Sequence, residues 1–260
     1  KKYTDPAIME GMKRGYDKLF RELLPRKVQE LDPDRFYMHG SPYEANWGRP
    51  ESWKIADSHN WGTWYGQKPF ESFDTEIPRF MSEYGFQAFP EMKTIATFAA
   101  PEDYALESEV MNAHQKASIG NFLIKKTMGL YYKVPEDFEQ LVYLGLVLQG
   151  QGMRHGMEAH RRNRPYCMGT LYWQLNDSWS VVSWSSIDYY GNWKAMHYQA
   201  KRAFAPVLVD AIKEGDDLNI YVMSDKLEAD KDVTLQLRLM DFDGKVLKKK
   251  EIKGEVPANA

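Results

Sequence analysis

Four short apolar segments, each followed by polar or aromatic residues, constrain the fold of this chain more than any other feature. They are residues 35–39, 55–61, 79–84 and 166–173. Long connections separate them, and an alternation of buried strands with helices is typical of a parallel sheet. The carboxyl ends of parallel strands meet at one edge of a sheet. The polar and aromatic residues are therefore expected to line one common site.

Helices are predicted around these strands. Apolar residues recur at near-helical spacing over residues 6–31, with Pro6 in the first turn. Two long helices are predicted after Pro101 and Pro135, and a closing helix is predicted over residues 192–204. The chain therefore combines the elements of an α/β protein.

The pattern of apolar residues changes at Pro206, and this change divides the chain into two parts. Residues 1–205 supply about four strands, and a (β/α)8 TIM barrel needs eight, so this part is predicted to be the C-terminal half of a catalytic barrel. Residues 218–222 and 233–239 alternate with period two, and Asp243-Gly244 predicts a hairpin turn. Residues 206–260 are therefore predicted to form a partial antiparallel β-sandwich, immunoglobulin-like and too short to be complete.

Composition excludes several classes of function. The 260 residues include 34 Lys and Arg against 37 Asp and Glu, so no broad basic face suggests a nucleic acid or an anionic membrane as a partner. No stretch approaches the roughly 20 apolar residues that a membrane helix needs. A single cysteine excludes an internal disulfide framework. Neither end of the sequence reads as a natural terminus, so the chain is expected to be a fragment of a longer protein.

Glu83 is the candidate catalytic residue. It ends the third apolar segment, where a carboxylate is costly to bury unless it is paired or used in chemistry. Trp61, Trp64 and Tyr65 lie at and after the end of the preceding segment, and Trp173 ends the following one. Flat rings around a carboxylate suit a sugar, whose C–H surface stacks on aromatic faces while the carboxylate approaches C1. An ion pair with an arginine is the structural alternative for Glu83.

Several segments resemble the β-mannosidases of glycoside hydrolase family 2. They are Ser82–Gln87, Asp57–Trp61, Leu171–Trp179 and Ser185–Lys194, in that family's order and over nearly the whole chain. Within Ser82–Gln87, the run Ser-Glu-Tyr-Gly is less specific, because related β-glucuronidases carry it too. The resemblance implies a retaining exo-β-mannosidase that removes terminal β-linked mannose from the non-reducing ends of an oligosaccharide or glycan, without a metal or other cofactor.

The resemblance also implies roles for individual residues. Glu83 matches the nucleophile, Tyr65 resembles the tyrosine that hydrogen-bonds the nucleophile, and Trp173 resembles the tryptophan that lines the mannose subsite. Second-rank candidates for the substrate pocket are Trp61, Asn176 and Asp177.

A retaining glycosidase needs a second carboxyl group, which protonates the leaving oxygen and later activates water. In the family that this sequence resembles, the acid/base glutamate follows an asparagine at the end of the fourth barrel strand. No Asn-Glu pair occurs in the sequence, and Asp57 and Asp177 lack the pattern. The acid/base is therefore expected upstream, in a missing N-terminal part that this chain needs as its partner, and the chain alone is expected to be inactive.

Other signals receive structural interpretations. His155 and His160 are five residues apart on a predicted helix and point in different directions, so no metal site is predicted. Gly150-Gln151-Gly152 indicates close helix packing, and residues 161–164 are interpreted as a solvated, basic helix end. Cys167 is interpreted as part of the core.

Two alternatives remain open from the sequence. The first is another family 2 exo-β-glycosidase, of glucuronidase or glucosaminidase type. The second is a non-catalytic fragment that acts only as a sugar-binding or assembly module.

Overall fold

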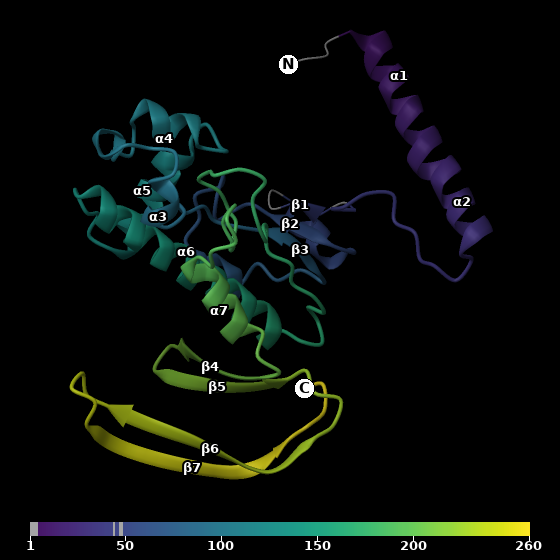
Figure 1. Ribbon diagram of the computed structural model, residues 1–260. Coiled ribbons are helices and arrows are strands. Elements are labelled where there is room, and N and C mark those ends of the chain that lie inside the picture. The colour runs from purple at the N-terminus through teal and green to yellow at the C-terminus, as the bar shows by residue number, and fades with distance from the viewer. Residues whose placement is uncertain (1–4, 44, 47–48) are drawn as a thin grey trace.

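The computed structural model describes residues 5–43, 45–46 and 49–260. Within these ranges an elongated N-terminal helix stands apart from the rest, a small parallel sheet lies beside a layer of helices, and two β-hairpins lie beneath (Figure 1). Part of the long connection between the first two predicted strands, at residues 40–54, lies outside the described residues.

The predicted N-terminal helix is confirmed. It consists of α1 (Pro6–Tyr16), a π-helical segment η1 (Asp17–Leu23) and α2 (Leu24–Leu31). The Asp5 side chain accepts a hydrogen bond from the Ala7 N–H at 2.8 Å and caps the helix. No residue of the three segments is buried, and Leu31 is 79% exposed. The helix stands apart from the other elements (Figure 1), and most of the apolar side chains that predict it are exposed.

The prediction of a strand at residues 35–39 is wrong. This segment is a turn followed by an extended connection, and Phe36 is 83% exposed. The segment is tied to the helix instead of to a sheet: the Tyr37 hydroxyl donates to the Phe20 carbonyl at 2.8 Å, and the Tyr16 hydroxyl donates to the His39 carbonyl at 3.1 Å. The short apolar run therefore contacts one helix and pairs with no strand among the described residues.

The next two predicted strands are confirmed, although both are short. β1 (Ala45–Asn46), β2 (Ser58–Asn60) and β3 (Met81–Tyr84) form a parallel sheet in that order. A short 3-10 helix, η2 (Pro50–Lys54), lies between β1 and β2, and η3 (Phe70–Asp74) lies between β2 and β3.

The fourth predicted strand, residues 166–173, runs parallel to β3 without forming a regular strand. Met81 N–H donates to the Gly169 carbonyl at 2.9 Å, and Trp173 N–H donates to the Tyr84 carbonyl at 2.8 Å. A Cβ at Gly169 would lie only 2.1 Å from the Phe80 ring, so the backbone passes directly over that ring. The irregular segment still brings Trp173 to the end of the sheet where Glu83 lies.

The predicted long helix after Pro101 is wrong. The region holds a 3-10 turn η4 (Pro101–Asp103) and two separate helices, α4 (Glu109–Ala113) and α5 (Gly120–Tyr131). Ser108 caps α4 by accepting a hydrogen bond from the Met111 N–H at 3.2 Å, and this cap starts a new helix where the prediction had a continuous one. A further short helix, α3 (Met92–Ile95), precedes them.

The other helix predictions are confirmed by α6 (Phe138–Arg162) and α7 (Ala195–Ala203). α6 packs closely on the core: a Cβ at Gly152 would lie 2.3 Å from the Phe70 ring, and one at Gly156 would lie 3.0 Å from Tyr84. The glycines of α6 therefore allow close packing, as the sequence indicates.

The C-terminal module consists of two antiparallel hairpins. β4 (Val207–Glu214) pairs with β5 (Asp217–Ser224), and β6 (Asp230–Met240) pairs with β7 (Val246–Val256). Gly244 has φ +86° in the turn between β6 and β7, as predicted for the Asp-Gly pair. The hairpins lie one over the other, beneath α6 and α7 (Figure 1).

The interpretation of residues 161–164 as a solvated helix end is wrong. The Arg161 side chain is 6% exposed and pairs with Asp225 at 2.8 Å, while Arg162 pairs with Asp74 at 2.6 Å and with Asp210. These arginines therefore join the end of α6 to the first hairpin.

Candidate active site

Glu83 lies near the end of β3, with its side chain 26% exposed. Its Oε2 atom accepts a hydrogen bond from the Trp61 indole Nε1–H at 3.2 Å. The same oxygen lies 3.2 Å from Nδ1 of His59, a residue that is paired with Glu83 in the register of β2 and β3. Among the described residues, the polar contacts of Glu83 fall on Oε2.

Behind His59 lies a second carboxylate. The Ser41 hydroxyl lies 3.2 Å from His59 Nε2 and donates to Asp57 Oδ2 at 2.5 Å. Asp57 also accepts hydrogen bonds from the Ser82 hydroxyl at 2.7 Å and from the Tyr43 N–H at 2.9 Å. Burial raises the pKa of Asp57, but these three hydrogen bonds together bring it below its ordinary value, so the carboxyl group is held ionised.

The Trp61 ring contacts Glu83, and further aromatic rings adjoin Trp61. The Trp61 ring contacts Tyr65, at a centroid distance of 6.1 Å, and Trp184, at 5.9 Å. A Cβ at Gly85 would lie 2.3 Å from the Trp173 carbonyl oxygen and 3.2 Å from both the Trp61 and Trp184 rings. Gly85 therefore lets the Trp173 backbone approach the ring cluster beside Glu83.

Tyr65 and Trp173 keep open faces, since they are 47% and 43% exposed. Among the contacts of the described residues, the hydrogen bond to Glu83 comes from the Trp61 indole, and Tyr65 touches the pocket through the Trp61 ring. The roles that the resemblance implies for Tyr65 and Trp173 stay predictions.

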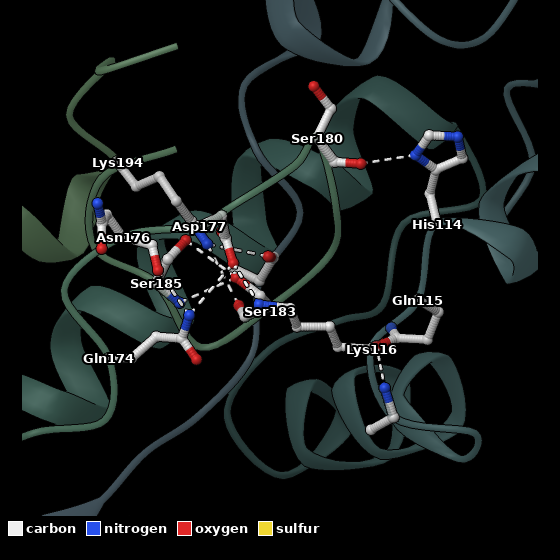
Figure 2. A network of polar contacts seen from close by, with 12 residues as sticks. His114, Gln115, Lys116, Gln174, Asn176, Asp177, Ser180, Ser183, Ser185 and Lys194 are labelled. Atoms are coloured by element: carbon white, nitrogen blue, oxygen red, sulfur yellow. Dashed lines mark hydrogen bonds and ion pairs between the residues drawn. The ribbon is translucent and has the colours of Figure 1, made fainter. Parts of the chain in front are cut away.

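Asp177 and Asn176 lie in a different environment (Figure 2). The Asp177 side chain is 1% exposed, and its Oδ1 pairs with Lys116 Nζ at 2.9 Å. Its Oδ2 accepts from the Ser183 hydroxyl at 2.6 Å. Asn176 is exposed, and its backbone oxygen accepts from Gln174 Nε2 at 2.6 Å. Asp177 is thus the centre of a buried polar network that we call the Asp177 network, defined by Lys116, Gln174, Asp177, Ser183, Ser185 and Lys194.

Lys194 joins the Asp177 network through a hydrogen bond to the Ser183 carbonyl (Figure 2). It is 1% exposed, and its Nζ donates to the carbonyls of Ala88 at 3.0 Å and Ser183 at 3.3 Å. Burial lowers the pKa of Lys194 to about 7, although the nearby carboxylates of Asp177 and Asp188 oppose this effect. The Lys194 amine is thus a buried donor that links the backbone at Ser183 to the backbone at Ala88.

The sequence interpretation missed His59, Ser41 and Trp184 as parts of the site. Asp57, His59 and Trp61 are alternate residues, the spacing that places side chains on one face of a strand, and this pattern could have identified His59. Ser41 and Trp184 are distant in the sequence, and no local pattern marks them.

Metal-binding and membrane-spanning features were sought among the described residues. The described residues contain no group of three His, Cys, Asp or Glu side chains that could hold a metal ion. In the same part of the chain, no helix has the length and apolar character that crossing a bilayer requires.

Comparison with known proteins gives consistent matches. A family model described as a mannosidase Ig/CBM-like domain matches residues 216–260. The β-mannosidase of Capra hircus is 34% identical over 257 residues, which cover 91% of this chain and 29% of that protein. A β-mannosidase B of Neosartorya fischeri is 34% identical over 215 residues, 78% of this chain and 24% of that protein.

Solved structures agree with these matches. The crystal structure of a β-D-mannosidase from Dictyoglomus thermophilum matches with a TM-score of 0.86 and 35% identity, covering 94% of this chain and 30% of that one. An exo-chitosanase of Amycolatopsis orientalis matches with a TM-score of 0.63 and 20% identity, over 74% of this chain and 25% of that one, and supports the fold alone.

By sequence and fold the chain is thus related to glycoside hydrolases. More narrowly, the chain is a homologue of β-mannosidases of the family 2 type over more than nine tenths of its residues. It spans less than one third of the length of these relatives.

Proposed function

We propose that this chain is part of a retaining exo-β-mannosidase and that Glu83 is its nucleophile. The observation that carries the proposal is the setting of Glu83: its Oε2 accepts a hydrogen bond from Trp61 at 3.2 Å and lies 3.2 Å from His59 Nδ1, and the side chain stays 26% exposed. The homology to β-mannosidases supplies the substrate class, a terminal β-D-mannose residue of an oligosaccharide or glycan.

The proposed reaction has two displacements. In the first, an electron pair on Glu83 Oε1 forms a bond to C1 of the mannose, and the bond from C1 to the leaving oxygen breaks. A second carboxylic acid gives its proton to that oxygen. In the second, the resulting carboxylate takes a proton from water, the water oxygen bonds to C1, and the Glu83–C1 bond breaks with its electrons returning to Glu83.

The second carboxyl group is proposed to lie in a segment outside this chain. The sequence contains no Asn-Glu pair, and Asp57 and Asp177 are both occupied by hydrogen bonds within the fold. We therefore propose that residues 1–205 are the C-terminal half of a TIM barrel, which an N-terminal segment completes, and that residues 206–260 are part of an immunoglobulin-like β-sandwich. The exposed apolar stripe of α1 and α2 supports a missing covering layer.

Mechanism-based labelling tests the nucleophile. A 2-deoxy-2-fluoro-β-mannosyl fluoride should leave a covalent mannosyl adduct on the peptide that contains Glu83 when it reacts with the full-length protein. The E83Q variant is the control, because it keeps the shape of the side chain and loses the attacking charge. An adduct on any other carboxylate would refute the assignment of Glu83.

Substrate preference separates this proposal from the alternatives. Turnover of aryl β-mannoside by the full-length protein should exceed turnover of the β-glucuronide and the β-glucosaminide. Faster cleavage of either of those would favour another family 2 glycosidase. Binding of mannoside without any turnover would favour a sugar-binding module.

A further inference from the structure

The Trp61 indole donates a hydrogen bond to Glu83 whose direction is fixed by chemistry. An indole N–H is a donor only, and a carboxyl oxygen is able to accept from it whether the group is ionised or esterified. The bond runs from Trp61 Nε1 to Glu83 Oε2 at 3.2 Å and joins residues 22 positions apart, the first directly after β2 and the second within β3. It therefore holds one oxygen of the carboxyl group from a neighbouring part of the sheet.

The neighbouring indoles show that such a bond is not a general property of this ring cluster. Trp64 is 1% exposed and Trp184 is 9% exposed. Their rings contact each other at a centroid distance of 5.9 Å, and the Nε1 atom of each has no hydrogen-bond partner among the described residues. Trp61 is less buried than either, yet its N–H is the one that is paired. The cluster thus directs one of these three donors to the carboxylate.

A hydrogen-bonded turn fixes the backbone from which the Trp61 ring projects. It begins at Trp61 and ends at Lys68, and we call it the Trp61 turn. The Trp61 carbonyl accepts from the N–H groups of Trp64 and Gly66, both at 3.2 Å. The Lys68 N–H donates to the Gly62 carbonyl at 2.9 Å. A Cβ at Gly66 would lie 2.6 Å from the Gly62 carbonyl oxygen, so the backbone segments of the turn are in direct contact.

A buried polar pair, Asn60 and Glu76, anchors this turn. Asn60 is 0% exposed, and its Oδ1 accepts from the Gly62 N–H at 2.9 Å. Its Nδ2 donates to Glu76 Oε2 at 3.0 Å. Glu76 Oε1 pairs with the ammonium group of Lys68, at the far end of the Trp61 turn. One buried carboxylate therefore connects to both ends of the turn.

The Trp61 ring is also restrained by its neighbours. It contacts the Tyr65 ring at 6.1 Å with an interplanar angle of 59°, and the Trp184 ring at 5.9 Å with an angle of 69°. Gly85 lies against it, since a Cβ there would be 3.2 Å from the Trp61 ring. With its backbone and its ring both fixed, the indole presents its N–H to Glu83 without a rotation that would have to be restricted during the reaction.

We propose that Trp61 is the positioning residue of the nucleophile. Its N–H, held on Oε2, sets the rotation of the Glu83 carboxyl group so that Oε1 faces the sugar. The Asn60–Glu76 pair acts one step further away, by holding the Trp61 turn. This inference rests on the proposed function, in which Glu83 Oε1 attacks C1 of the mannose.

The indole keeps its proton through both displacements. When the Oε1–C1 bond forms, Oε2 becomes the carbonyl oxygen of the ester, and the N–H continues to donate to it. When water bonds to C1, the electrons of the Oε1–C1 bond return to Glu83, and the N–H stabilises the carboxylate that forms. Because Trp61 orients the nucleophile, its loss should slow the chemical step more than it weakens binding of the sugar.

The W61F variant tests this role, because it keeps an aromatic ring and loses the N–H. With 2-deoxy-2-fluoro-β-mannosyl fluoride and the full-length protein, the labelling rate at saturating reagent should fall roughly 10²-fold, the usual cost of one preorganised donor. The half-saturating concentration should stay within about twofold of wild type, since the nucleophile is misplaced rather than the sugar. An unchanged labelling rate would overturn the proposal.

The matched control is W64F. Trp64 belongs to the same turn and the same buried core, and its Nε1 has no partner among the described residues. This variant should lose stability through the core and keep a labelling rate within about threefold of wild type. An equal loss of rate in W64F and W61F would assign the effect to ring packing and overturn the proposal. Benzothienylalanine in place of Trp61 keeps the shape of the indole with sulfur instead of N–H, and it should label as slowly as W61F.

A spectroscopic measurement tests the contact without any turnover. The full-length protein is labelled with ¹⁵N-tryptophan, and the indole signal of Trp61 is assigned by its absence in W61F. E83A should shift this signal, because the indole loses its acceptor, and should leave the signal of Trp64 in place. A Trp61 signal that is the same in E83A and wild type would overturn the proposal, whatever the activity of the protein.

The outcomes separate the two proposals. If the adduct maps to Glu83 and W61F labels at the wild-type rate, the positioning role is wrong and the nucleophile stands. If the adduct maps to another carboxylate, the proposed function fails first. N60A, or E76Q if N60A does not fold, supports the anchor if it slows labelling and moves the Trp61 signal. A wild-type rate and signal would contradict the anchor.

Discussion

Glu83 lies at the end of one apolar segment and Asp177 follows another, yet the two carboxylates have different surroundings in the structure. Glu83 has its polar contacts among the described residues on one oxygen, and its side chain is 26% exposed. Asp177 is 1% exposed, and both of its oxygens are occupied, by Lys116 and Gln174 on one side and Ser183 on the other. The sequence predicts both for the pocket, because the same pattern of an apolar run and a polar end precedes each.

The difference teaches what separates a reactive carboxylate from a structural one. A carboxylate that is buried and hydrogen-bonded at both oxygens inside the protein, as Asp177 is, cannot be reached by a substrate. One that is bound at a single oxygen is oriented and still open. Site-directed variants should therefore divide into those that change catalysis and those that change stability.

The largest effect on catalysis is expected for E83Q. The amide keeps the shape of the side chain and cannot attack C1, so kcat on an aryl β-mannoside should fall on the order of 10⁴-fold or more in the full-length protein. The melting temperature should stay close to that of wild type, because the Glu83 side chain is partly exposed and its polar contacts with described residues involve one oxygen. A variant with wild-type kcat would remove Glu83 from the mechanism.

The largest effect on stability is expected for D177A. It leaves the Lys116 ammonium and the Ser183 hydroxyl without their partner and removes a charge that stabilises the buried Lys194. The free energy of unfolding should fall by about 3 kcal/mol, as when one member of a buried ion pair is removed. Urea denaturation measures it. Unchanged stability together with lost turnover would place Asp177 in the pocket and undo the comparison.

Gly85, the residue that follows β3, has no room for a larger side chain. G85A places a methyl group 2.3 Å from the Trp173 carbonyl oxygen and 3.2 Å from two indole rings, so the ring cluster must shift. We expect a loss of about 2 kcal/mol in stability and roughly tenfold in kcat/KM. G129A in α5 is the control, since its Cβ would meet only Val134 at 3.7 Å, and it should not destabilise the protein.

The sequence predicts the elements that local patterns define. β3, α6, α7, β5 and the hairpin of β6 and β7 form where periodicity, caps and turn residues indicate them. Predictions fail where a distant partner decides the structure. Residues 35–39 have the composition of a strand, but the hydroxyls of Tyr37 and Tyr16 tie the segment to the first helix.

The same distinction applies to the candidate site. Placing Trp61 beside Glu83 needs only the rule that neighbouring parallel strands end together, and the structure confirms their contact. The contact between His59 and Ser41 joins residues that are 18 positions apart in the sequence. The ion pair of Asp177 is formed with Lys116, which is 61 residues away. Neither can be read from spacing along the chain.

The pH dependence of stability should report on Lys194. Its pKa in the folded protein, about 7, lies below the ordinary value of 10.5, so between these pH values the unfolded chain binds one proton more than the folded protein. Stability of wild type should therefore rise relative to K194M by up to about 1.4 kcal/mol per pH unit from pH 7 to pH 10. Below pH 7 the difference should be constant. Melting temperatures of both proteins across this range measure the effect, and parallel curves throughout would mean that Lys194 stays charged when folded.

The smallest effect is expected for N176A. Asn176 is exposed. Its hydrogen bond with Gln174 uses the backbone oxygen of Asn176, which alanine retains. Both kcat/KM on an aryl β-mannoside and the melting temperature should therefore stay within about twofold and about 2 °C of wild type, as for most surface substitutions. A loss of tenfold or more in kcat/KM at unchanged stability would extend the pocket from Glu83 to the rim of the Asp177 network. The two regions would then form one site instead of a reactive carboxylate beside a structural one.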